Sequence, residues 1–387
     1  MSDILQSSDD IHVYSSSASS ARAEARSSRL RLRELDGLRG WAAFSVLLFH
    51  STWQTFGENF AVLRNSWTAA LVDGSLDVSV FFVVSGAALS APFFAGGGGE
   101  YILSAALRRY IRLTTPIVAT VLLLTLAERL GLARLAEASH IAPGLSAIAG
   151  ETGLSLAQAL KWAFCNVYTK PFEWGPVLPF LWTMPWEIVG SLALFLLLAC
   201  YPAMKRPERS IAIGACFLML LFPYLAAFLF GALIGKARLT GALVAPAPRR
   251  LAFLDTLAAK IVIAAALYAL AAWSMTAGAV PHAHVILAVA IVAVALRWRG
   301  LSDFLAENAV SRFLAKISFP LYLVHYVVIA TATSELIVFA GNRITLPLAI
   351  AISAATILLS VVAAVLFQPV ERLAHAASRR FAALVLG

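Results

Sequence analysis

Nine long apolar runs dominate the sequence and constrain its fold more than any other feature. Short polar segments separate these runs, which occupy residues 40–56, 75–94, 113–131, 177–200, 210–235, 256–275, 283–297, 317–340 and 345–368. A transmembrane helix needs roughly 20 apolar residues, so runs of this length are typical of membrane spans. Charged residues make up only 13% of the chain, against about 25% in a soluble protein. The composition therefore excludes a soluble enzyme and a nucleic-acid-binding protein.

The number of spans depends on the fifth run, 210–235, which contains Pro223 and is either one long span or a helical hairpin. Lys and Arg gather in cytoplasmic loops. With a hairpin and a cytoplasmic N-terminus, 23 of the 30 basic residues lie on the cytoplasmic side, whereas a single span spoils this alternation. The sequence predicts an all-α integral membrane protein of the cell (inner or plasma) membrane. We expect about ten transmembrane helices in one bundle, with both termini cytoplasmic.

The charge and apolar patterns divide the chain into three parts. Residues 1–33 are rich in Ser and poor in apolar residues, which predicts a disordered cytoplasmic tail. Residues 34–375 form the predicted transmembrane domain, and residues 376–387 a second cytoplasmic tail. In the long outer segment 132–176, the stretch from Leu154 to Phe164 predicts a short amphipathic helix that lies in the membrane interface.

Ionisable residues inside spans are costly and therefore mark candidate functional positions. His50 follows Arg39 by eleven residues, which in an α-helix is three turns plus about 20°, with a separation of about 16 Å. The two side chains are thus expected on one helix face, with Asp36 on nearly the same face. The alternative is an Arg39 that reaches the interface and a buried His50 satisfied by a neighbouring helix.

Glu187 and His325 are the other two intramembrane candidates. Glu187 follows Pro185, which breaks the helical hydrogen-bond ladder, and its buried carboxylate needs a partner. We expect an imidazole from another span, and the alternative is a structural tie to a His or an Arg. His325 either faces the interior or packs between helices. His282 and His284 have no further ligands at matching spacing, so we predict no metal site.

Three arginines stand at the cytoplasmic end of the third run: Arg108, Arg109 and Arg112. Arg109 and Arg112 are three residues apart and so share a helix face. Their positions are explained equally well by the preference of basic residues for the cytoplasmic side and by a phosphate clamp.

Five of these segments, in the same order, resemble the motifs of the acyltransferase 3 family of integral-membrane acyltransferases. They cover about residues 33–375, and they are Arg33 to Ala43 followed by His50, Phe81 to Gly86, Arg109 to Pro116, Leu181 to Glu187, and Ile317 to His325. One position departs from the family pattern. Many members carry Asp two residues before the Phe-Phe pair, where this chain has Ser79, with Asp77 two residues earlier.

The resemblance implies transfer of an acyl group, usually acetyl, from cytoplasmic acyl-CoA to a hydroxyl of a glycan, a lipid or a small metabolite. It implies no permanently bound cofactor. We expect His50 to act as general base or relay, because the unperturbed pKa of histidine is about 6.5, and Glu187 to orient it. Arg39, at the inner mouth, is the third expected catalytic residue. The expected donor-binding residues are Arg108, Arg109 and Arg112, and the further candidates are Asp36 and His325.

Two other functions fit the same residues. A proton-coupled transporter uses intramembrane His and Glu residues as a proton relay. A membrane scaffold without catalytic activity tolerates replacement of both Arg39 and His50.

Overall fold

A computed structural model describes residues 32–65, 68, 71–150, 153–169, 177–246, 248–276, 278 and 280–386. The predicted disordered tail, 1–33, therefore lies almost entirely outside the described residues. Leu32 precedes the first described helix, which begins at Arg33.

All regular elements among the described residues are helices, as the apolar runs predict. Ten of these are at least 15 residues long: α2 (Arg33–Leu48), α4 (Gly74–Pro92), α5 (Gly98–Arg129), α9 (Met184–Cys200), α10 (Pro207–Leu221), α11 (Pro223–Leu239), α12 (Leu257–Thr276), α13 (Pro281–Arg297), α15 (Ala309–Val328) and α17 (Leu346–Leu386). The shorter α-helices are α6 (Leu135–Ile141), α7 (Leu156–Lys161), α8 (Val167–Thr169), α14 (Arg299–Glu307) and α16 (Ser334–Ala340). The ten long helices follow the predicted spans in chain order.

The number of membrane crossings is less well supported than the number of helices. Among the described residues, five helical stretches are long and apolar enough to span a membrane, or six if the bent pair α13 and α14 is one span. The reason is length. Helices α2, α10, α11 and α13 have only 15 to 17 residues, or about 23–26 Å at ~1.5 Å per residue, against a hydrocarbon core of about 30 Å. The structure supports a helical membrane protein and does not confirm ten crossings.

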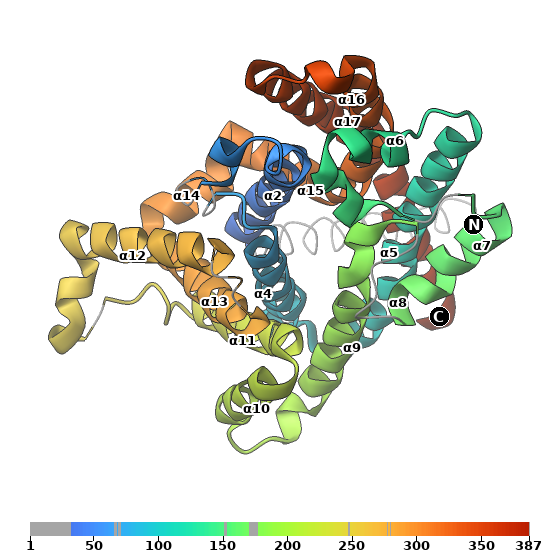
Figure 1. The fold of residues 1–387 in the computed structure, drawn as a ribbon. Coiled ribbons are helices and arrows are strands. Elements are labelled where there is room, and N and C mark those ends of the chain that lie inside the picture. Colours follow the sequence, from blue (N-terminus) through green and yellow to red (C-terminus); the bar gives the residue numbers. More distant parts are fainter. Residues whose placement is uncertain are drawn as a thin grey trace, which may run out of the picture.

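The central helices enclose the region where the candidate residues lie. Figure 1 shows α2, α4, α5, α9 and α15 around the middle of the molecule, with α12 at its edge. Helix α2 packs on α15, α4 packs on α11 and α13, and α17 packs on α15 and α5. Only 11% of the apolar window of α12 is buried, so this helix turns most of its surface outward.

The run 210–235 is split as the hairpin interpretation predicts. Helix α10 ends at Leu221, Phe222 has the non-helical angles φ −140° and ψ 70°, and Pro223 begins α11. Pro lacks the backbone donor needed inside a helix and is favoured in a first turn, which explains the break. The two helices pack against each other.

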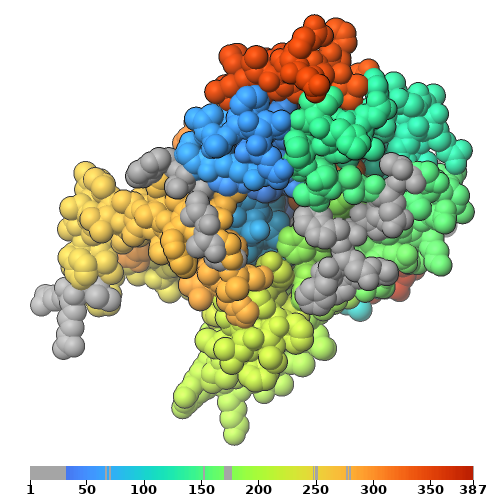
Figure 2. Space-filling view, viewed as in Figure 1, coloured from blue at the N-terminus to red at the C-terminus, as the bar shows by residue number. Residues whose placement is uncertain are grey.

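The predicted helix between Leu154 and Phe164 is present as α7 and a following π-helical turn, Trp162–Asn166. Ser155 and Gln158 form a reciprocal capping box that starts α7. Trp162 is buried and Phe164 is 45% exposed, so the segment has two distinct faces. Figure 2 shows this green segment on the same face of the molecule as the blue surface of α2. Its position relative to a membrane stays a prediction.

Two boundaries differ from the sequence-based ones. Helix α17 continues from Leu346 to Leu386, so residues 376–386, part of the predicted second tail, form the end of a long helix. Helix α5 begins at Gly98, whereas the apolar run begins at residue 113. The apolar run starts later than the helix because Arg108, Arg109 and Arg112, expected at the cytoplasmic end of the span, interrupt the apolar pattern before residue 113. They lie well inside the helix.

Glycines allow α4 and α11 to pack at very short distance. A Cβ atom on Gly86 of α4 would lie 2.1 Å from the backbone oxygen of Phe228 in α11, and one on Gly231 would lie 2.0 Å from the oxygen of Val83. Small residues permit this close approach of helix backbones, which favours association in membranes. The pair α4–α11 therefore depends on both glycines.

We expect Gly86→Ala to destabilise the protein by about 1–3 kcal/mol, because backbone atoms must move to admit the methyl group. The matched control is Gly214→Ala in α10, where the nearest atom to a new Cβ is 3.9 Å away. Thermal unfolding in detergent measures both variants. Equal melting temperatures for the two variants would contradict the role given to close packing.

Candidate active site

A cavity of about 790 Å³ lies between α2, α4, α5, α9, α15 and α17. We call it the arginine cavity. Its polar lining residues are Asp36, Arg39, Ser85, Tyr101, Arg108, Arg109, Arg112, Thr183, Glu187, Ser318, Tyr322, Glu371 and His375. Four arginines face three carboxylates there, so its formal charge is positive. The structure thus brings together six of the eight predicted site residues.

Arg109 and Glu187 form a buried ion pair in the cavity wall. Their side chains are 8% and 12% exposed, and Nη2 of Arg109 contacts Oε1 of Glu187. Nε of Arg109 also donates to Oγ of Ser191 at 3.0 Å, and Oγ of Ser85 donates to Glu187 at 2.9 Å. These bonds connect α5, α9 and α4. Buried charges are tolerated when they are paired and hydrogen-bonded in this way.

The partner of Glu187 differs from the one that we expected. The side-chain bonds of Glu187 run to Arg109 and Ser85, which is the Glu–Arg tie given above as the alternative. Glu187 lies in the first turn of α9, after a 3₁₀ turn, Pro179–Thr183, and Pro185 is part of that first turn. An acidic side chain near a helix N-terminus is favoured by the helix dipole. Glu187 therefore holds a cavity arginine in place.

The other cavity arginines differ in how far they are engaged. Nη2 of Arg39 pairs with Oδ1 of Asp36 at 3.2 Å, while Nε of Arg39 is buried without a hydrogen-bond partner. Nε of Arg108 donates to the carbonyl of Ser104. Arg112 interacts electrostatically with Glu371 of α17. Its guanidinium group makes no hydrogen bond to the described residues. Arg112 and Arg39 therefore keep donors for an anion in the cavity.

His50 lies beyond the arginine cavity, in a π-helical segment, Phe49–Gln54, that continues α2. Nδ1 of His50 contacts Oε1 of Gln54, and because an amide oxygen accepts, the proton lies on Nδ1. Neutral His50 then carries its lone pair on Nε2. The uniform α-helix assumed from the sequence is wrong at this position, although π-helical turns are frequent at functional sites.

His325 of α15 lies directly beside His50. Their ring centroids are 5.4 Å apart, and His325 is only 1% exposed. Nδ1 of His325 donates to the carbonyl of Leu321 at 2.9 Å, so its lone pair is also on Nε2, and this atom is buried with no partner. The structure thus places the two imidazoles side by side, and we call them the histidine pair.

Three further residues contribute to the two sites and were not identified from the sequence. Gln54 fixes the tautomer of His50, and its spacing of four residues on one helix was the available signal. Glu371 and His375 of α17 line the arginine cavity, with Nε2 of His375 3.8 Å from Oε1 of Glu371. They follow the last apolar run, which ends at residue 368.

His284 has a structural partner. Its Nε2 lies 3.4 Å from Oδ2 of Asp73, which also accepts a hydrogen bond from Ser274 at 3.1 Å. The other oxygen of Asp73 caps the first turn of α4. In the part of the chain that the structure describes, no group of three or more His, Cys, Asp or Glu residues is arranged to hold a metal ion.

A family model described as an acyltransferase domain matches residues 32–365. The chain belongs to the acyltransferase 3 family. Membership points to a membrane acyltransferase, and it confirms the resemblance based on the five motifs. No curated protein and no solved structure matches the chain. Glu371 and His375 lie beyond the matched residues.

The buried pair provides a stability test. We expect Arg109→Leu or Glu187→Leu alone to cost about 3–5 kcal/mol, because each leaves an uncompensated buried charge. The double variant is expected to lose much less than the sum. The exposed pair Arg64–Glu58, at 3.3 Å, is the control, and its loss is expected to cost at most about 1 kcal/mol.

Thermal or chemical unfolding of the three variants in detergent gives the coupling energy. Simple additivity of the two single losses would mean that Arg109 and Glu187 do not depend on each other.

Proposed function

We propose that this chain is a membrane O-acyltransferase that moves an acyl group, typically acetyl, from acyl-CoA to a hydroxyl of a glycan, a lipid or a small metabolite. The observation that carries the proposal is the combination of an arginine cavity with a buried histidine pair that lies outside the cavity wall. The arginine cavity suits a polyanionic donor, and the histidine pair suits removal of a proton from an alcohol.

The donor fits the arginine cavity in size and in charge. The volume of the cavity, about 790 Å³, is within the range of about 300–1,000 Å³ typical of ligand sites. Phosphate oxygens accept charge-assisted hydrogen bonds from guanidinium groups, and Arg39 and Arg112 have donors to give. Because acyl-CoA is made inside cells, we assign the arginine end of the bundle to the cytoplasmic side of the cell membrane, in agreement with the distribution of basic residues.

The histidine pair supplies the base. An alcohol is a weak nucleophile at neutral pH, so catalysis requires a group that accepts its proton. In our proposal Nε2 of His50 accepts the proton while the hydroxyl oxygen attacks the thioester carbonyl. The C–S bond then breaks, and CoA leaves as a thiol after taking up that proton. Gln54 holds the tautomer that this step needs, and Glu187 acts at a distance by fixing Arg109.

His50→Ala tests the assignment. We expect release of free CoA from acetyl-CoA by the purified protein, in the presence of acceptor-containing membrane extract, to fall by about 10²–10⁴-fold, because the base is lost. The control variant is His140→Ala on α6, an exposed residue that is expected to keep full activity. A thiol-reactive dye measures the released CoA.

Equal rates for wild type and His50→Ala would rule out His50 as the base. Absence of CoA release from the wild type, together with substrate uptake driven by a pH gradient in liposomes, would instead support a transporter.

A further inference from the structure

The arginine cavity and the histidine pair are not joined. Thr183, Met184 and Tyr322 line the cavity, and neither His50 nor His325 is part of its wall. His50 is 8% exposed and His325 is 1% exposed. A donor bound in the cavity is therefore separated from the two imidazoles by the residues packed between them.

The ring of Phe180 occupies the space beside both imidazoles. Its centroid lies 3.7 Å from that of His50 and 4.8 Å from that of His325, with the rings tilted by 20° and 9°. The edge of Tyr326 closes another side, with its centroid 5.0 Å away. Phe180 is 4% exposed, so its ring is buried beside the two imidazoles.

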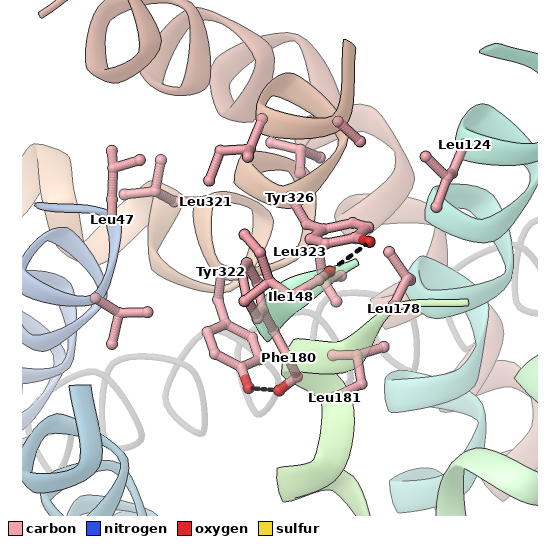
Figure 3. Packing of buried hydrophobic residues seen from close by; sticks show 14 of the residues in the cluster. Leu47, Leu124, Ile148, Leu178, Phe180, Leu181, Leu321, Tyr322, Leu323 and Tyr326 are labelled. Carbon is pink, nitrogen blue, oxygen red and sulfur yellow. Dashed lines mark hydrogen bonds between the residues drawn. The ribbon is translucent and has the colours of Figure 1, made fainter. Parts of the chain in front are cut away.

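Hydrogen bonds hold the backbone around Phe180, whereas no hydrogen bond holds its ring. The hydroxyl of Tyr322 contacts the carbonyl of Phe180, and the same hydroxyl is 2.8 Å from Oγ1 of Thr183, as the 3₁₀ turn Pro179–Thr183 brings both groups to it. Figure 3 shows the first of these bonds and the corresponding bond from Tyr326 to the carbonyl of Ile148. The ring itself makes only stacking and apolar contacts, so its rotation breaks no hydrogen bond.

An unpartnered polar atom lies next to this ring. Nε2 of His325 is buried and has no hydrogen-bond partner in the arrangement described. Buried polar atoms without a partner are rare and call for an explanation, such as a ligand that completes the site. A substrate hydroxyl beside His325 would satisfy this nitrogen once the Phe180 ring has moved.

We propose that Phe180 is a partition that shields the histidine pair: its ring covers both imidazoles, keeps water away from them and rotates to admit the acyl group. This proposal rests on the proposed function, since it assumes that the acyl donor occupies the cavity. Phe180 is a positioning residue, because it acts through His50 and His325.

Removal of the partition has a specific chemical consequence. Water can then reach the imidazoles and replace the acceptor alcohol. A water oxygen forms the new bond to the acyl carbon, the thioester C–S bond breaks, and one water proton passes through the imidazole to the CoA sulfur. The products are a free carboxylic acid and CoA thiol, so the variant consumes acetyl-CoA without any acceptor.

The experiment compares wild type, Phe180→Ala and the control Phe164→Ala, whose side chain is 45% exposed on the surface. The first readout is modification of His50 and His325 by diethyl pyrocarbonate, quantified by mass spectrometry. The second is acceptor-free hydrolysis of acetyl-CoA by the purified protein. For Phe180→Ala we expect at least tenfold faster modification of both histidines and at least tenfold faster hydrolysis, and for Phe164→Ala no change.

Unchanged modification of His50 in Phe180→Ala would overturn the partition, whatever the enzyme activity. If Phe180→Ala fails to fold, Phe180→Leu leaves a smaller opening, with faster modification still expected. The failure of the proposed function looks different: no wild-type turnover of acetyl-CoA under any condition, with the modification readout unaffected. Faster hydrolysis cannot arise from mere loss of structure, which lowers activity.

Discussion

The cost of placing charge in an apolar bundle determines how this site is built. Arg109 and Glu187 are both largely buried, and each is tolerated because the other is present. Ser191 and Ser85 satisfy further hydrogen-bonding positions of the pair. Since these four groups come from α5, α9 and α4, the pair fixes how the three helices meet around the arginine cavity. The other charged residues of the cavity lining lie around this pair, and they are Asp36, Arg39, Arg108, Arg112 and Glu371.

This arrangement separates the chemistry into two regions. The arginine cavity is lined by charged side chains and suits polar ligands. The histidine pair is instead enclosed by aromatic rings. A neutral imidazole is the form that accepts a proton, and enclosure excludes competing water. In our proposal Phe180, whose ring stacks on both imidazoles, limits access to the histidine pair.

Much of the fold could be predicted because apolar length and proline positions act locally. The runs corresponding to the ten long helices, the break at Phe222 before Pro223 and the amphipathic segment beginning near Leu154 are all visible in the sequence. The crossing number was less certain, since several helices are shorter than a full span. The extension of α17 to Leu386 was missed, because a polar helix end resembles a tail.

The candidate residues were found for a different reason. Ionisable groups are scarce in apolar runs, so Arg39, His50, Glu187 and His325 stood out without any structural information. Their partners could not be found in this way. Which helix lies beside which is set by packing between distant segments, and the sequence alone did not distinguish a Glu187–Arg109 pair from a Glu187–His50 pair. The π-helical turn that presents His50 had no recognised signal.

The central claim is that an acyl-CoA donor occupies the arginine cavity with its acyl end toward the histidine pair. An electron cryo-microscopy structure with a non-hydrolysable thioether analogue of acetyl-CoA tests this most directly. We expect phosphate oxygens within hydrogen-bond distance of Arg39 and Arg112, and the acyl end next to Thr183 and Tyr322. An analogue bound elsewhere on the protein, with the cavity empty at saturating concentration, would contradict the account.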